Sequence, residues 1–263
     1  MGKTILITGA TDGIGLLTAE KLANAGHTVL IHGRNRDRLN AAAARVGAGS
    51  DTYLADLSKM QDVVKLAQDV KSGHGSLDIL INNAGVLKTP DVLTETGRDV
   101  RFEVNTLAPY VLTRLLLPSM PQSGRVVNLS SAAQAPVDVS AMQSFRAMGD
   151  MEAYAQSKLA ITIWSAALAG QMPNGPVVVS VNPGSLLASK MVKEGFGLAG
   201  SDLNIGADIL VDAALGPRFS AATGRYFDND SGRFAEPHAA ALDHDHVASV
   251  MAVLDEMAAP YLD

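Results

Sequence analysis

The sequence predicts an α/β fold in which a doubly wound parallel sheet of about seven strands carries helices on both faces. Short β-rich runs alternate with amphipathic stretches along all 263 residues, which is the pattern of repeated strand–helix–strand units. The β-rich runs are nearly continuous in hydrophobic residues, as expected for strands that are covered on both faces. A glycine-rich turn directly follows the first run, at a place where such sheets bind ligands.

The strands and helices follow from this alternation in order along the chain. The β-rich runs lie at Thr4–Ile7, Thr28–Ile31, Thr52–Leu54, Leu77–Ile81, Arg125–Leu129 and Val177–Val181. The amphipathic stretches between them lie near Ile14–Ala25, Arg36–Val46, Ser58–Val70, Val100–Leu117 and Ala153–Ala169. Because neither a linker nor an internal repeat interrupts this order, we expect residues 1–263 to form a single domain.

Two segments are too long for routine connections, which usually have about 2–6 residues. One is Ala132–Glu152, between a strand and a helix, and the other is Gly184–Asp202, which carries Gly195, Gly197 and Gly200. Long irregular segments at the carboxyl ends of strands tend to build the ligand site. We therefore expect these two segments to be substrate loops that face each other, the second closing over substrate.

Composition excludes several classes of function. The chain has no cysteine, which excludes disulfides, thiolate metal sites and cysteine nucleophiles. Its net charge of −6 argues against a nucleic-acid partner, because phosphate binding needs clustered Lys and Arg. No window is apolar enough for a membrane span, and the apolar run Ile5–Ile7 is too short for a secretory signal. We therefore expect a cytoplasmic protein.

The turn after the first strand reads Thr8-Gly9-Ala10-Thr11-Asp12-Gly13-Ile14-Gly15. Glycines there allow a tight turn and let backbone N–H groups approach a pyrophosphate, and a helix that begins near Gly13 adds its positive end. Glycine turns are common, so the glycines alone are a weak signal. The strand before them and the helix after them favour a dinucleotide-binding turn.

The end of the second strand predicts which dinucleotide is bound. Its residues are Gly33-Arg34-Asn35-Arg36, and no acid precedes Asp37. An acid at this place accepts from the ribose 2′-hydroxyl of NAD, whereas an arginine favours the 2′-phosphate of NADP. Arg34 therefore favours NADP(H), with NAD(H) as the alternative; a solvated charge at a helix start is the structural alternative for Arg34. Asp12, an acid inside the glycine turn, argues slightly against NADP.

Further motifs follow in order along the chain: Asp56-Leu57, Asn82-Asn83-Ala84-Gly85, Asn105, Asn128-Leu129-Ser130-Ser131, Tyr154-x-x-x-Lys158 and Asn182-Pro183-Gly184. With the glycine turn, they resemble the short-chain dehydrogenase/reductase family over nearly the whole chain. The long segment between Ser131 and Tyr154 is similar to the retinol-dehydrogenase-like branch. This resemblance implies a Rossmann-like fold, a nicotinamide cofactor, one dinucleotide-binding catalytic domain and a homo-oligomer, either a dimer or a tetramer.

The resemblance also implies roles for individual residues. With Arg34 and its neighbour, the expected cofactor-binding residues are Gly9, Thr11, Asp12, Gly13, Ile14, Gly15, Arg34, Asn35, Asp56, Leu57, Asn83, Ala84, Gly85, Tyr154, Lys158, Pro183, Gly184 and Leu186. In the family, Asp56-Leu57 contacts the adenine and Lys158 also holds the nicotinamide ribose. The family's usual threonine is replaced by Ala188, with Ser189 one place later, which leaves open the group that holds the carboxamide.

The expected catalytic residues are Asn105, Ser131, Tyr154 and Lys158. Reduction of a carbonyl needs a proton donor near neutral pH, yet the pKa of free tyrosine is about 10. Tyr154 and Lys158 are four residues apart and share a helix face, so we expect the lysine to lower the pKa of the phenol. Ser131 would hydrogen-bond the substrate oxygen, with Ser130 as the competing candidate. Asn105 resembles the residue that anchors a water in a proton path to Lys158.

Two other stretches contain residue types that bind metals, but neither matches a known metal-site pattern. The spacing in His238–His246 fits no closed zinc pattern, and Asp243 or Asp245 could cap the final helix. Asp228–Gly232 has the composition of a calcium loop but lacks its twelfth-position glutamate, so we interpret it as a turn. We therefore expect no bound metal.

These observations predict an oxidoreductase that transfers a hydride between NADP(H) and a carbonyl or secondary alcohol. We expect an apolar substrate, because Phe145, Met148, Leu187, Met191 and Phe196 lie in the two loops; simple packing of the loops is the alternative. A catalytically silent NADP(H)-binding regulatory or scaffold protein is the competing function, although such proteins often lose the tyrosine or lysine. A sugar-nucleotide epimerase or dehydratase would need a second substrate domain.

Overall fold

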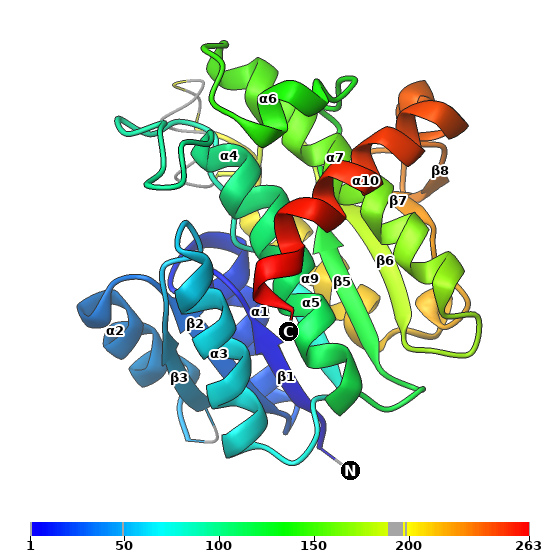
Figure 1. Ribbon diagram of the computed structural model, residues 1–263. Coiled ribbons are helices and arrows are strands. Elements are labelled where there is room, and N and C mark those ends of the chain that lie inside the picture. Colours follow the sequence, from blue (N-terminus) through cyan, green and yellow to red (C-terminus); the bar gives the residue numbers. More distant parts are fainter. Residues whose placement is uncertain (1, 49, 189–196, 198, 263) are drawn as a thin grey trace.

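A twisted sheet runs through the computed structural model, which describes residues 2–48, 50–188, 197 and 199–262 (Figure 1). In sheet order the strands are β3 (Ser50–Leu54), β2 (Thr28–Gly33), β1 (Thr4–Ile7), β4 (Ile79–Asn82), β5 (Arg125–Leu129), β6 (Val177–Asn182), β7 (Tyr226–Asp228) and β8 (Arg233–Ala235). Neighbouring strands are parallel except β7 and β8, which are antiparallel. The predicted fold class is confirmed: the six runs named from the sequence are strands, and β7 and β8 bring the sheet to eight strands where about seven were expected.

Helices cover both faces of the sheet (Figure 1). One face carries α1 (Gly13–Asn24), α2 (Arg36–Val46) and α9 (Leu203–Leu215), and the other carries α3 (Met60–Gly73), α5 (Ala108–Leu116) and α7 (Asp150–Gln171). Within β1, Ile5 and Ile7 pack toward the α1 face and Leu6 packs toward the α7 face. Because both faces are covered, successive residues of a strand are all apolar, which explains the continuous hydrophobic runs.

The C-terminal part of the chain packs on the helices of the second face. α10 (His244–Ala258) lies against α7 and against α6 (Val139–Gln143), as Figure 1 shows. Asp243 caps α10, since its carboxylate accepts from the backbone N–H groups of Asp245 and His246. The cap predicted in this stretch is therefore Asp243.

One predicted helix is interrupted. The stretch Val100–Leu117 forms α4 (Val100–Phe102), then a π-helical segment at Glu103–Leu107, and then α5. A π-helical segment inside an α-helix is frequent at functional sites. Asn105 lies in the middle of this segment.

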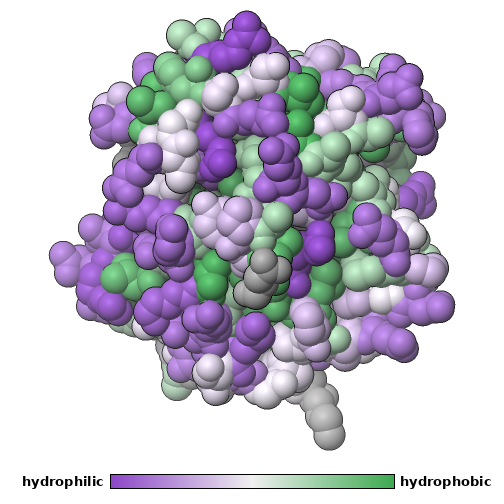
Figure 2. Space-filling view, viewed as in Figure 1, coloured by the Kyte–Doolittle hydropathy of each residue, from purple (hydrophilic) through white to green (hydrophobic). Residues whose placement is uncertain are grey.

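On the face of the molecule shown in Figure 2, hydrophilic and hydrophobic residues are interspersed. Among the residues that the structure describes, no helix is both long and apolar enough to cross a membrane.

The parallel strands bring the segments that follow them to one edge of the sheet. The glycine turn follows β1, Arg34 and Asn35 follow β2, and Asn83 follows β4. Ser130 and Ser131 follow β5, and the segment that begins with Pro183 follows β6. This edge is where ligands bind in open α/β sheets.

Candidate active site

The glycine turn after β1 is packed on one side and open on the other. Gly9 has a φ of 65°, and a Cβ there would lie 2.8 Å from the Cα of Ala84. Gly13 has a φ of 54°, and a Cβ there would meet nothing within 4 Å. Gly9 therefore lets the turn lie against the end of β4, while Gly13 keeps backbone exposed at the start of α1. Such a cradle fits a pyrophosphate.

His32, a residue that the sequence did not single out, is hydrogen-bonded to the backbone of this turn. Its Nδ1 accepts from the backbone N–H of Gly9 at 3.2 Å, and its Nε2 lies 3.0 Å from the backbone oxygen of Ala55. Since Nδ1 is an acceptor, the proton must be on Nε2, which donates to Ala55. Burial lowers the pKa of His32 to about 4. The neutral imidazole thus joins the turns that follow β1 and β3.

Asn83 joins the same turn to the end of β4. Its Nδ2 donates to the backbone oxygens of Thr8 at 2.8 Å and Gly9 at 3.0 Å. The hydroxyl of Thr8 accepts from the backbone N–H groups of Asn83 at 3.0 Å and Ala84 at 3.1 Å. These bonds fix the turn before any ligand arrives, so little conformational entropy would be lost on binding.

Three basic or polar residues that follow β2 lie near the glycine turn and line one cavity with it. Asn35 caps α2 by accepting from the backbone N–H of Arg38, and Arg34 is exposed beside it. The guanidinium of Arg38 donates to Asp12 at 2.6 Å. Asp12, whose negative charge argued against a bound 2′-phosphate, therefore has a cationic partner. Arg38 itself was missed, because only the folded chain brings α2 to the glycine turn.

These segments enclose a cavity of about 330 Å³. Its lining includes sixteen of the expected cofactor residues, namely Gly9, Thr11, Asp12, Gly13, Ile14, Gly15, Arg34, Asn35, Asp56, Leu57, Asn83, Ala84, Gly85, Tyr154, Lys158 and Pro183. The other two, Gly184 and Leu186, line a neighbouring cavity instead. The lining also includes His32, Gly33, Arg38, Ala55, Val86, Val104, Leu129 and Ser130, which were not among the expected cofactor-binding residues.

Tyr154 and Lys158 lie one turn apart on α7, as their spacing predicts. The ammonium of Lys158 donates to the backbone oxygen of Leu129 at 2.7 Å and lies 5.6 Å from the centroid of the Tyr154 ring. Both side chains line the cavity at the carboxyl ends of the strands.

The pKa values of this pair differ from the sequence expectation. Burial raises the pKa of Tyr154, and the nearby hydroxyl of Ser131 opposes that rise. Burial lowers the pKa of Lys158 to about 8. The pKa of the Tyr154 phenol is therefore not lowered overall, since removal from water disfavours the charged form of both groups.

The two adjacent serines after β5 have different surroundings. Ser130 is buried, and its hydroxyl donates to the backbone oxygen of Lys158 at 3.0 Å and lies 2.6 Å from the hydroxyl of Thr162. Ser131 is half-buried; its hydroxyl opposes the rise in the pKa of Tyr154 and accepts from the backbone N–H of Ala133. Ser131 is thus the serine beside the phenol, and Ser130 fastens α7 to β5.

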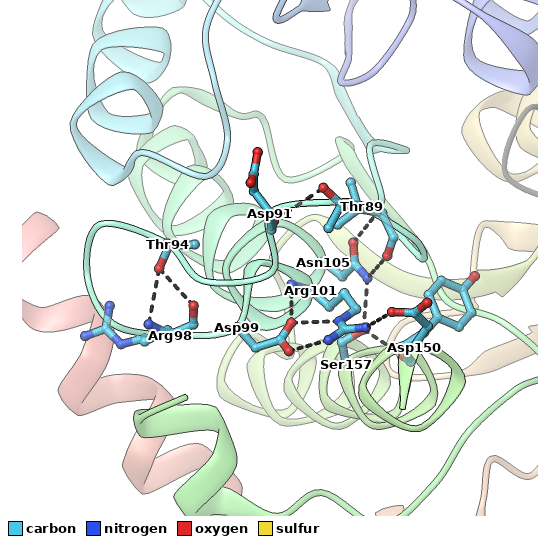
Figure 3. Close-up of polar contacts among 11 residues, drawn as sticks. Thr89, Asp91, Thr94, Arg98, Asp99, Arg101, Asn105, Asp150 and Ser157 are labelled. Atoms are coloured by element: carbon cyan, nitrogen blue, oxygen red, sulfur yellow. Dashed lines mark hydrogen bonds and ion pairs between the residues drawn. The ribbon is translucent and has the colours of Figure 1, made fainter. Parts of the chain in front are cut away.

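Asn105 lies below the cavities and lines neither of them. Its side chain donates to the backbone oxygen of Val86 and to the hydroxyl of Ser157, each at 2.9 Å, and accepts from the backbone N–H of Val86 at 2.8 Å (Figure 3). Its amide therefore joins the segment after β4 to α7. A proton path from Asn105 to Lys158 stays a prediction.

An ion cluster lies beside Asn105 and fastens the start of α7 (Figure 3). The side chain of Arg101 is 1% exposed and donates to both carboxylate oxygens of Asp99, at 2.8 and 2.5 Å. It also donates to Asp150, the first residue of α7, at 2.6 Å. Arg101 thereby fixes the end of the helix that carries Tyr154. The sequence gives no local signal for this cluster, since Arg101 and Asp150 are far apart along the chain.

A second cavity of about 370 Å³ adjoins the first. Ile14, Ser130, Tyr154 and Pro183 line both cavities. The remaining lining of the second cavity is mostly apolar: Leu87, Ser131, Ala133, Met151, Asn182, Gly184, Ser185, Leu186 and Leu187. The phenol of Tyr154 thus lies between a glycine-lined cavity and an apolar one.

The two expected substrate loops meet only in part within the described residues. Ala133 and Met151, at the two ends of the first loop, line the second cavity together with the start of the second loop. Phe145 and Met148 do not line it: the backbone N–H of Phe145 donates to Gly97, and Met148 packs against the core. Within the second loop, residues 189–196 and 198, and with them Ser189, Gly195, Met191 and Phe196, lie outside the described residues.

Comparisons with known proteins agree with this geometry. A family model described as short chain dehydrogenase matches residues 3–196. Human retinol dehydrogenase 13 is 34% identical over 194 residues, a match that covers 70% of this chain and 59% of the human protein.

Solved structures match over most of the chain. An uncharacterized protein from Mycobacterium paratuberculosis has a TM-score of 0.80 and 28% identity, with 97% of this chain and 93% of that chain covered. A short chain dehydrogenase from Shigella flexneri 2a, complexed with NADP, has a TM-score of 0.69 and 27% identity, with 87% and 97% covered.

Proposed function

The chain belongs to the short-chain dehydrogenase family, and we propose that it transfers a hydride between NADP(H) and an apolar carbonyl or secondary alcohol, with Tyr154 as general acid and base. The observation that carries this proposal is the position of Tyr154, which lines both the glycine-lined cavity and the apolar cavity. A proton donor in that position reaches the oxygen of a substrate whose carbon faces the cofactor.

Within this proposal the cofactor, when bound, supplies or accepts the hydride. Because burial raises the pKa of Tyr154, the phenol carries its proton at neutral pH and can donate it to a carbonyl oxygen. Ser131, which lines the apolar cavity with Tyr154, orients the same oxygen by a second hydrogen bond. The pKa of Lys158 is about 8, so the ammonium is mostly protonated at pH 7 and stabilises the phenolate that forms.

The preference for NADP(H) rests on the end of the first cavity. Arg34, Asn35 and Arg38 line it there, and the nearby carboxylate of Asp12 is paired with Arg38. An arginine fork matches the oxygens of a 2′-phosphate. The NADP complex of the Shigella flexneri relative is consistent with this choice.

The apolar substrate class rests on the second cavity. Apolar side chains from four separate segments line this cavity, including Ile14, Leu87, Met151 and Leu187. Such a lining binds apolar groups by removing them from water and offers few partners to the hydroxyls of a sugar. The name of human retinol dehydrogenase 13 refers to an apolar alcohol as well.

We also propose that residues 1–263 form one catalytic domain in a cytoplasmic homo-oligomer. The continuous sheet and the shared hydrophobic cores support the single domain. Light scattering coupled to size exclusion would determine the oligomeric state, and a monomer at assay concentration would contradict that part of the proposal.

The test of the proposed function is NADPH oxidation with a panel of carbonyl compounds. We expect turnover with apolar ketones or aldehydes, and much less with sugars and keto acids. Tyr154→Phe should lower kcat by about 10²-fold or more and leave NADPH binding, measured by fluorescence titration, close to that of the unmodified protein.

Tyr53→Phe is the matched control. Tyr53 lies in β3, its hydroxyl is hydrogen-bonded with His74, and it lines neither cavity. NADPH binding without turnover on any carbonyl or alcohol would favour the alternative of a silent regulatory or scaffold protein. Unchanged turnover in Tyr154→Phe would contradict the role of Tyr154.

A further inference from the structure

A short segment, Tyr226–Asp230, contacts both sides of the apolar cavity without lining it. We call it the β7 turn segment, because it comprises β7 and the first two residues of the turn that follows. It includes most of the stretch that only resembles a calcium loop in composition. It also lies outside the residues 3–196 that the family model matches.

The first residue of this segment supports Ser131. Tyr226 is 7% exposed, and its hydroxyl donates to the backbone oxygen of Ser131 at 3.1 Å. The side-chain amide of Gln134 donates to the same oxygen at 3.0 Å. Burial, with smaller contributions from Asp228 and Asp230, raises the pKa of Tyr226 well above its usual value. The phenol therefore stays a hydrogen-bond donor at every pH used for an assay.

The last residues of the segment support the opposite side of the cavity. The carboxylate of Asp230 accepts from the backbone N–H of Ser185 at 2.8 Å, from the Ser185 hydroxyl at 2.5 Å and from the amide of Asn182 at 2.9 Å. The amide of Asn229 donates to the backbone oxygen of Pro183 at 2.9 Å. Two adjacent residues thus fix the backbone of the chain as it leaves β6.

The residue after Ser185 explains why this support is needed. Leu186 has a φ of 52°, in the left-handed region that non-glycine residues adopt at a cost in free energy. Such a conformation persists only where neighbouring contacts hold it. Asp230 holds the preceding residue, and the backbone N–H of Ser201 donates to the oxygen of Leu186 at 2.8 Å. The side chain of Leu186 is 44% exposed and lines the apolar cavity.

We propose that the β7 turn segment positions both walls of the substrate cavity, Tyr226 through Ser131 and Asp230 through Ser185 and Leu186. The proposal rests on the proposed function for its kinetic consequences. Tyr226 and Asp230 are positioning residues, since each acts through a residue that lines the cavity. One rigid segment would thereby set the distance between the polar wall beside Tyr154 and the apolar wall at Leu186.

The two ends of the segment should affect different kinetic constants. Ser131 orients the reacting oxygen, so Tyr226→Phe should lower kcat about tenfold while the KM for substrate stays within twofold, a loss comparable to one hydrogen bond. Leu186 contributes apolar contact in the ground state and the transition state alike. Asp230→Ala should therefore raise the KM about fivefold to tenfold and change kcat less than twofold.

Hydrogen exchange tests the Asp230 contact without any turnover. The amide of Ser185 should exchange at least tenfold faster in Asp230→Ala, because its acceptor is removed. Ser231→Ala is the matched control: Ser231 lies in the same turn, and its hydroxyl donates to the backbone oxygen of Asp228, so exchange at Ser185 and both kinetic constants should stay as in the unmodified protein. Asp230→Asn, which keeps one acceptor oxygen, should give intermediate exchange and serves if the alanine variant fails to fold.

The outcomes separate this proposal from the proposed function. If the unmodified protein turns over no carbonyl or alcohol, the proposed function fails, while faster exchange at Ser185 in Asp230→Ala would still support the contact. Equal changes of kcat and KM in Tyr226→Phe and Asp230→Ala would overturn the proposal, because a general loss of stability predicts that pattern. Unchanged exchange at Ser185, or the same effects in Ser231→Ala, would overturn it as well.

Discussion

The neutral, buried His32 makes the stability of the protein depend on pH over a defined range. Its pKa is about 4 in the folded protein, against 6.5 for a free imidazole. Above pH 6.5 neither state binds the proton, so the full stability is present. As the pH falls below 6.5 the unfolded chain takes up a proton that folded His32 refuses until about pH 4, and stability is lost.

The magnitude follows from the size of the shift. A difference of 2.5 pKa units, from 6.5 to about 4, corresponds to about 3 kcal/mol in total at about 1.4 kcal/mol for each unit. About 2 kcal/mol of this loss falls between pH 7 and pH 5. Other groups also titrate there, among them His27, whose pKa is lowered mainly by burial. Their contribution cancels when two variants are compared.

The assay is urea unfolding at pH 7 and pH 5 for the unmodified protein and for His32→Gln, which cannot titrate. We expect the unmodified protein to lose about 2 kcal/mol more than the variant over this interval. Ile31→Val is the control, since it removes one buried methylene beside His32, costs about 1 kcal/mol at both pH values and keeps the imidazole. Equal losses in the unmodified protein and His32→Gln would refute the reasoning. The affinity for NADPH should fall only as the pH approaches about 4, where folded His32 takes up a proton and can no longer accept from Gly9.

Two further variants test the cofactor end and the support of α7. Arg34→Ala should weaken NADPH binding about tenfold more than NADH binding in a fluorescence titration, while Arg36→Ala, outside the cavity, should not; a preference of the unmodified protein for NADH would contradict the cofactor assignment. Arg101→Met should lower the free energy of unfolding by about 3–5 kcal/mol, because it leaves the carboxylate of Asp99 buried without its cation. Adding Asp99→Asn should restore part of that loss, and a change below about 1 kcal/mol in the single variant would argue against the cluster.

An acid at Gly33, which would favour NADH over NADPH, fits only if a neighbouring side chain moves. A Cβ at Gly33 would collide with the side-chain methyl of Thr11. The sequence identifies this position as the place of the acid in NAD-binding relatives of the fold. Only the packed turn reveals that an aspartate there requires the Thr11 side chain to move, so a change in cofactor preference is better sought at Arg34.

The parts that sequence predicted well depend on short-range geometry. The hydrophobic runs identify strands because a strand covered on both faces needs apolar residues throughout. The glycine turn is recognisable because strand, turn and helix are contiguous. Tyr154 and Lys158 lie together because residues four apart share one face of any α-helix.

The extra strand and the interrupted helix show where that reasoning ends. β8 has three residues, and its pairing with β7 depends on a turn at residues 229–232 rather than on a hydrophobic pattern. The π-helical segment at Glu103–Leu107 lies inside the continuous amphipathic stretch Val100–Leu117, so periodicity does not reveal the change in hydrogen bonding.

What the sequence determined by itself is the fold class, the glycine turn and the Tyr154–Lys158 pair, because each is written in residues that are neighbours along the chain. What only the tertiary structure decided is how those parts are held and charged. His32 and Gly9 are 23 residues apart, and Tyr226 and Ser131 are 95 apart. The raised pKa of Tyr154 likewise comes from burial between α7 and the sheet edge. Such contacts depend on which surfaces pack together, and a local pattern carries no information about that.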